Sequence, residues 1–178
     1  GHLKLAPEHT DPMVLQLMLK PSIRDFEAFS ELFHRYSVAA GHEQYIVPYF
    51  IAGHPGSTTR SMLDLALWLK KNRFRPQQVQ TFIPLPLTLA GAMHHAGRHP
   101  LILNRPGASR LRGTLHIPRS PGERAIQKAL LRYHAPESHD RIREALRELD
   151  RMDLCGRGAG CIVPNPADPS RRKPRRKT

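Results

Sequence analysis

Three short apolar stretches that alternate with amphipathic segments constrain the fold of this chain most. Residues 1–6 alternate like a strand, residues 44–51 form a nearly unbroken apolar run, and residues 79–83 are again strand-like. An unbroken apolar run is typical of a strand buried on both faces of a parallel sheet. With helical patterns between them, these strands predict a parallel α/β sheet or part of a barrel. A complete (β/α)8 barrel takes about 250 residues, so a chain of 178 residues would hold only part of one.

The intervening segments carry helix signals. A short helix is expected over residues 12–19, where Pro12 suits a first turn. A second is expected over residues 22–40, and a third over residues 59–72 after the cap-forming residues 57–59. In the second helix, apolar residues at steps of three and four predict a core-facing stripe, which consists of Phe26, Phe29, Phe33, Tyr36 and Ala40.

The second half of the chain has a different character. A short helix is expected over residues 87–97, followed by a loop rich in Gly, Pro and Arg over residues 101–117 with at most one strand. Two further helices, one starting at Pro121 and one over residues 142–149, are expected to form a helical hairpin outside the sheet. We therefore divide the chain into part of an α/β barrel (1–100), a small helical extension (101–163) and a disordered basic tail (164–178).

The charge balance leaves a polyanionic partner open. The chain has 28 Lys and Arg against 15 Asp and Glu, a net charge of +13. A nucleic acid would be contacted weakly through the basic residues of the tail, although no aromatic residue is interleaved there for base stacking. The same residues also suit a tail that only improves solubility. They are Arg171, Arg172, Lys173, Arg175, Arg176 and Lys177.

Two thiols and a pair of adjacent histidines provide no metal site. Cys155 and Cys161 lack a His or carboxylate at ligand spacing, so they cannot complete a tetrahedral site, and we expect two ordinary thiols in a loop. His94 and His95 would point about 100° apart on a helix and are expected to be surface imidazoles. No apolar run is long enough for a transmembrane helix. We expect no membrane partner and a reducing, cytoplasmic location.

The ends of the predicted strands are the candidate site. In open α/β sheets and barrels, ligands bind at the carboxyl ends of the strands. Three polar, Pro- or Gly-containing turns follow the strands here: Pro7-Glu8-His9, His54-Pro55-Gly56 and Pro84-Leu85-Pro86. The Glu8 carboxylate could accept hydrogen bonds from ribose hydroxyls or an ammonium group, and Gly56 would let a ligand approach the backbone. A capping carboxylate and a tight turn explain the same residues equally well.

Several local motifs, in the same order along nearly the whole chain except the basic tail, resemble the YgiQ-type radical SAM proteins. Early motifs are Leu3-Lys4-Leu5-Ala6-Pro7-Glu8-His9-Thr10, Leu19-Lys20-Pro21, Gln44-Tyr45 and Pro48-Tyr49-Phe50-Ile51. Later ones are His54-Pro55-Gly56, Leu65-Ala66-Leu67-Trp68-Leu69-Lys70, Pro84-Leu85-Pro86, Ala129-Leu130-Leu131-Arg132-Tyr133-His134 and residues 142–164.

This resemblance implies a partial TIM-like radical SAM barrel that begins at about its fourth strand. The family uses a 4Fe-4S cluster, ligated by a Cys-x3-Cys-x2-Cys loop, to cleave S-adenosylmethionine (SAM) to a 5′-deoxyadenosyl radical with an electron from a reducing donor. That loop is absent here. We therefore expect the C-terminal part of an enzyme, which alone retains neither cluster nor SAM and is inactive. Its substrate and catalytic residues are unknown.

Carried over by position, the resemblance implies a SAM pocket at the strand ends. Glu8, with His9 beside it, resembles the polar residue that contacts the SAM ribose. His54, Pro55 and Gly56 resemble the turn on the adenosine side, and Pro84 and Pro86 the turn that borders the adenine or the substrate. Two departures, Leu85 for a small residue and His94-His95 for an aromatic pair, bear on substrate specificity. The alternative function is a non-catalytic basic α/β module that binds RNA or another polyanion.

Overall fold

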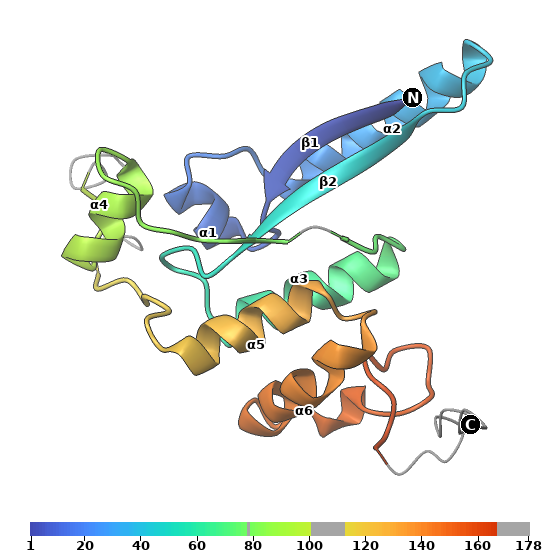
Figure 1. Cartoon of the computed structure of the whole chain (residues 1–178). Helices are drawn as coiled ribbons and strands as arrows, with labels where there is room; N and C mark the ends of the chain where they lie inside the picture. Colours follow the sequence, from blue (N-terminus) through green and yellow to red (C-terminus); the bar gives the residue numbers. More distant parts are fainter. Residues whose placement is uncertain (78, 101–112, 167–178) are drawn as a thin grey trace, which may run out of the picture.

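The computed structural model describes residues 1–77, 79–100 and 113–166, and three parallel strands organise it. Strands β1 (His2–Glu8), β2 (Tyr45–Ala52) and β3 (Gln80–Thr81) lie in the order β1-β2-β3 (Figure 1). β1 pairs with β2 from His2 opposite Tyr45 onwards, and the register shifts before Glu8, which lies opposite Phe50. The predicted parallel α/β order is confirmed, while its membership of a barrel stays a prediction.

The helices begin where short polar side chains can accept from free backbone N–H groups. Asp11 caps α1 (Pro12–Leu17), Ser22 caps α2 (Ile23–Ala39), and Thr58 forms a capping box with Ser61 at the start of α3 (Thr59–Lys71). Helix α4 (Leu89–Ala96) ends at Gly97 in the left-handed conformation.

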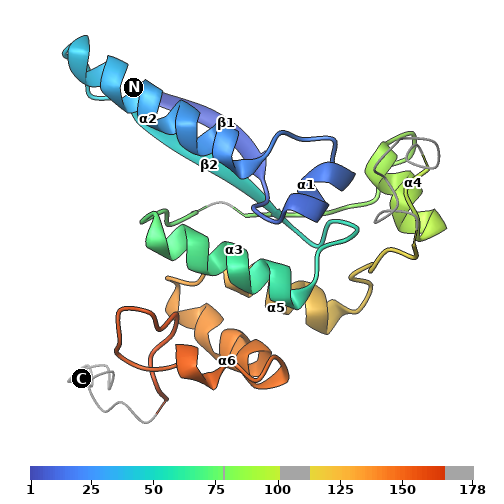
Figure 2. The same ribbon diagram turned by 180° about the vertical axis from the view of Figure 1, so that it is seen from behind.

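Two further helices follow, α5 (Pro121–Leu131) and α6 (His139–Glu148), with single 3-10 turns at Pro136–Ser138 and Met152–Leu154. Helix α5 lies beside α3 in both views, and α6 packs on α5 on the side away from the sheet (Figures 1 and 2). The predicted helical pair is therefore present. Its first helix also contacts β2 and β3, so it reaches the sheet itself.

The main hydrophobic core joins residues on both sides of the boundary expected at residue 100. Helix α3 contributes Leu65 and Leu69, α5 contributes Leu130, and α6 contributes Ile142 and Leu146, all fully buried. Burying a leucine or isoleucine side chain stabilises a fold by about 1.5–3 kcal/mol. The extension therefore shares one core with α3 and does not form a separate one.

Three details of the sequence prediction are wrong. The run 44–51 is not buried on both faces, because only its end at Phe50 is buried. The stripe on α2 is not core, since Phe29 is 43% exposed and Tyr36 is 65% exposed. The third strand is shorter than the range 79–83. Apolar patterning does not itself show how completely a face is covered: α2 lies along β1 and β2 and its Phe26 contacts Trp68 and Phe74, whereas Phe29 and Tyr36 stay exposed (Figures 1 and 2).

Parts of the expected chain lie outside the described residues. These are most of the loop expected over 101–117 and the six basic residues of the tail. Residues 113–117, which are described, form no strand. Among the helices that the structure describes, none is long and apolar enough to cross a membrane.

Candidate functional site

The carboxyl ends of the three strands meet at one edge of the sheet because the strands are parallel. His9 follows β1, His54 follows β2, and Phe82 follows β3. The ring of His54 lies 5.6 Å from that of Phe82 in an edge-on arrangement, and His54 interacts electrostatically with His9. Side chains from three successive strand ends therefore gather at one place.

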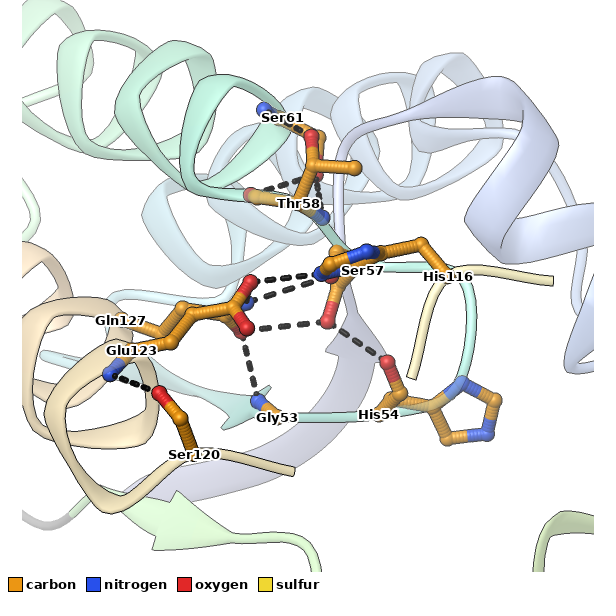
Figure 3. Close-up of polar contacts among 9 residues, drawn as sticks. All are labelled: Gly53, His54, Ser57, Thr58, Ser61, His116, Ser120, Glu123 and Gln127. Atoms are coloured by element: carbon orange, nitrogen blue, oxygen red, sulfur yellow. Dashed lines mark hydrogen bonds and ion pairs between the residues drawn. The ribbon is translucent and has the colours of Figure 1, made fainter. Parts of the chain in front are cut away.

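Gln127 of α5 holds the turn after β2 in position (Figure 3). Its Oε1 accepts from the Gly53 N–H at 2.9 Å and from the Ser57 hydroxyl at 3.1 Å, and its Nε2 donates to the Ser57 carbonyl at 3.1 Å. Gln127 and Ser57 are fully buried. Buried polar groups are normally hydrogen-bonded, and this amide provides partners for the Gly53 N–H and the Ser57 carbonyl.

A second set of contacts ties the same turn to the segment before α5. The N–H of Gly56 donates to the His116 carbonyl at 2.7 Å, while His116 Nε2 lies 2.6 Å from Oε1 of Glu123. Gly56 has a φ of +92°, and a Cβ there would stand 2.3 Å from Cδ1 of Leu17. Only glycine fits this position without displacing the buried Leu17 side chain.

The buried histidines at this edge are neutral at physiological pH. Burial is the main reason that the pKa values of His9 and His54 fall to about 4. Nδ1 of His9 accepts from the N–H groups of Thr10 and Asp11, so the ring proton is on Nε2, which has no partner among the described residues. Nδ1 of His54 donates to the Pro55 carbonyl, which leaves Nε2 as an acceptor.

The other predicted site residues differ in burial and in the contacts that they form. Glu8 has a φ of 69°, and its carboxylate lies 3.5 Å from Nζ of Lys20. Pro55 is buried in the turn, Pro84 is half-buried, and Pro86 is exposed. The structure thus gathers His9 and His54 but directs Glu8 towards an ion pair. The SAM pocket at these residues stays a prediction.

Sequence reasoning missed the residues that hold the turn. Gln127, Glu123 and His116 lie about 60 to 75 positions along the chain from it, as the separation of 74 between Gly53 and Gln127 illustrates. One signal was available, because Gln127 is a polar residue among the apolar positions of α5. Phe82 lies in the predicted third strand and, with Val79-Gln80, in one of the motifs of the family resemblance, but the sequence does not predict it as a site residue.

Both cysteines are free thiols, and they lie away from this edge. The carbonyl of Cys161 accepts from Lys70 in the last turn of α3, whereas the site lies at the first turn of that helix. Cys155 donates to the Pro164 carbonyl. Among the described residues, no group of three potential metal ligands occurs. Two thiols at the opposite end of α3 do not fit an iron-sulfur cluster at the strand ends.

Parallel strands joined by helices, with polar groups gathered at their carboxyl edge, place the chain among α/β proteins with a candidate ligand site at that edge. The chain belongs to the family described as domain of unknown function DUF3362, which matches residues 77–178.

Relatives extend the likeness to nearly the whole chain. It is 46% identical over 164 residues to a UPF0313 protein of Pseudomonas aeruginosa, with 92% of this chain and 21% of the relative covered. It is 43% identical over 176 residues to the UPF0313 protein YgiQ of Escherichia coli K12, with 99% of this chain and 23% of that protein covered. The chain thus spans less than a quarter of these relatives' length. No solved structure matches.

Proposed function

We propose that this chain is the C-terminal part of a radical SAM iron-sulfur enzyme, with the carboxyl edge of β1, β2 and β3 as one wall of the SAM pocket. The observation that carries the proposal is the gathering of His9, His54 and Phe82 from three successive parallel strand ends. The similarity to UPF0313 proteins, of which the chain covers less than a quarter, supports the C-terminal placement.

In this proposal the chain binds and orients SAM and excludes water. Nε2 of His54 accepts a hydrogen bond from an amino or hydroxyl group of the adenosine, and the Phe82 ring offers an apolar surface. Glu8 keeps acceptor capacity beyond its ion pair with Lys20 and contacts the ribose. Pro84 and Pro86 border the adenine or the substrate.

A bound 4Fe-4S cluster would supply the electron that cleaves SAM, and we assign its ligands to a part of the complete polypeptide outside this chain. Cys155 and Cys161 lie at the far end of α3, which disfavours them as cluster ligands in this proposal. The 178-residue chain alone is therefore expected to retain no cluster and to leave SAM intact.

The test uses the complete polypeptide that carries this chain in its source, reconstituted anaerobically with iron and sulfide. The expected result is reductant-dependent 5′-deoxyadenosine, measured by chromatography. His54→Ala should raise the apparent Kd for SAM about tenfold, since about 1.4 kcal/mol is the scale of one hydrogen bond to a buried acceptor. His42→Ala, at an exposed residue beyond the opposite end of β2, is the matched control and should leave SAM binding unchanged.

Absence of 5′-deoxyadenosine from an iron-loaded protein would contradict the proposal. The alternative function, a basic module that binds RNA without catalysis, is favoured by one observation, the net charge of +13. It requires tight RNA binding whose logarithm falls steeply with the logarithm of salt concentration. Weak contact through the tail alone would not meet that requirement.

A further inference from the structure

A row of aromatic rings continues from the strand ends towards α4. The ring of Phe82 lies 5.6 Å from that of His54 on one side and 5.9 Å from that of His94 on the other. Nδ1 of His94 is buried and has no partner among the described residues. His54 and Phe82 are buried, so the row is a packed apolar contact with polar ring atoms at both ends, next to the candidate SAM site.

Two arginines from the second half of the chain reach this row. The stem of Arg124 on α5 runs past the end of β2, with Cγ 3.8 Å from the position that a Cβ on Gly53 would take. Arg119 donates from Nη2 to the His94 carbonyl at 2.7 Å, which uses one of its five N–H groups.

Positive charge at this place lacks a counter-charge. Burial lowers the pKa of His94, the positive charges of Arg119, His95 and Arg124 lower it further, and no carboxylate acts in the opposite direction. Neither arginine forms an ion pair with any described residue. The carboxylate of Glu123, adjacent to Arg124 in sequence, is held by His116 and Gln127.

Like charges held together are destabilising unless an anion joins them. We propose that Arg119 and Arg124, both exposed, bind an oxyanion group, a carboxylate or phosphate, of the enzyme's substrate, and that the packed row His54–Phe82–His94 gives this site a rigid base. Calling the ligand a substrate rests on the proposed function. The oxyanion site itself rests on the two guanidinium groups, which suit bidentate binding of such groups.

This assignment gives the extension a chemical role at the sheet edge. Gln127 fixes the turn, and Arg124, three positions earlier on the same helix, extends over it. Residues three apart lie on the same face of a helix, so one helix face both positions the strand end and supplies a ligand-binding group.

The experiment is arginine footprinting of the complete polypeptide with phenylglyoxal, with modification measured residue by residue by mass spectrometry. Inorganic phosphate and malonate are the probes, for phosphate and carboxylate groups respectively. At saturating probe, the modification rates of Arg119 and Arg124 should fall about tenfold, because a guanidinium engaged in charge-assisted hydrogen bonds is withheld from the reagent. Arg24, exposed at the start of α2, is the internal control and should change less than about twofold.

A variant tests whether the two arginines act together. Arg124→Gln should abolish the protection of Arg119, whereas Arg24→Gln should preserve it. Equal protection of Arg24, or no protection at either site arginine, would overturn the oxyanion site. Because footprinting needs neither SAM nor a cluster, loss of 5′-deoxyadenosine formation with protection intact would refute the proposed function and leave the anion site standing.

Discussion

Replacement of Gln127 by leucine should release the turn after β2. The substitution keeps the side-chain volume roughly constant but removes the acceptor for the Gly53 N–H and the donor to the Ser57 carbonyl. Both groups are buried, so the loss includes the cost of leaving them unpaired, about 1–3 kcal/mol for each such group. Partial relaxation of the turn should reduce the sum, and we expect local stability to fall by about 2–3 kcal/mol.

Hydrogen exchange is the suitable assay because it reports this turn alone. A loss of about 2–3 kcal/mol corresponds to a roughly 30- to 150-fold faster exchange of the Gly53 amide, provided that exchange proceeds through local opening. Mass spectrometry of peptides that cover residues 53–58 in the complete polypeptide would measure it. Gln16→Leu is the matched control, because Gln16 is exposed on α1 and its side chain forms no hydrogen bond with the described residues.

The reasoning would be refuted if Gln127→Leu left exchange of these peptides within about twofold of the parent, which is the range expected for a surface change. Gln127→Glu separates shape from hydrogen bonding. Its carboxylate keeps an acceptor for Gly53 but faces the Ser57 carbonyl without a donor. Its effect should therefore weaken at acidic pH, where protonation restores a donor.

Four further predictions follow from the same structure. The pKa values of His9 and His54 are lowered to about 4 in the folded protein, so on acidification the unfolded state takes up a proton on each histidine at a higher pH than the folded state does. The stability linked to each neutral histidine is therefore full above about pH 6.5. It falls by up to about 3 kcal/mol per residue as the pH decreases towards 4. Hydrogen exchange of the turn, corrected for intrinsic rates and compared at pH 7.5 and 5, would reveal it; a turn equally protected at both values would contradict it. Gly56→Ala should destabilise the complete polypeptide by more than about 2 kcal/mol, because the new Cβ meets Leu17, whereas Gly41→Ala, with a similar positive φ and open space, should cost only about 1 kcal/mol in urea unfolding. An equal loss of unfolding free energy in the two variants would contradict the steric argument. The 178-residue chain alone should self-associate through its uncovered strands in light scattering; a monomer with a sharp thermal transition would disprove that. Anaerobic reconstitution of this chain should yield neither stoichiometric iron nor cluster absorption, and finding both would show that its two thiols do hold a cluster.

Local signals predicted most of the fold. The capping side chains of Asp11, Ser22 and Thr58 bind backbone N–H groups only two or three residues further along the chain. Because this signal is local, the sequence alone indicates where α1, α2 and α3 begin. Burial was harder to predict. The aromatic positions on α2 have the period of a core stripe, yet Tyr36 is largely exposed, because periodicity identifies an apolar face without identifying what covers it.

The sequence predicts only those residues of the candidate site that lie at the ends of strands. His54 follows a strand that the sequence predicts, and Glu8 ends another, so both residues could be found from the sequence. Two contacts depend instead on how separate segments pack, which no local pattern encodes. They are the ion pair of Glu8 with Lys20 and the hydrogen bond from the Gly53 N–H to Gln127. Side-chain roles at this edge therefore had to come from the structure.

The position of α5 explains why an extension beyond the predicted barrel strands would matter to a site at their ends. Its apolar residues join α3 and α6 in one core, so the helix is fixed in place by packing. Its polar residues then act at defined distances: Gln127 on the turn after β2, and Arg124 beside Gly53. Because the same rigid helix carries both groups, the turn and the proposed oxyanion site should be coupled, and Gln127→Leu should weaken phosphate protection of Arg124 as well as loosen the turn. If protection survives unchanged while the Gly53 amide exchanges freely, Arg124 holds its ligand independently of the turn, and the two roles of the helix are separate.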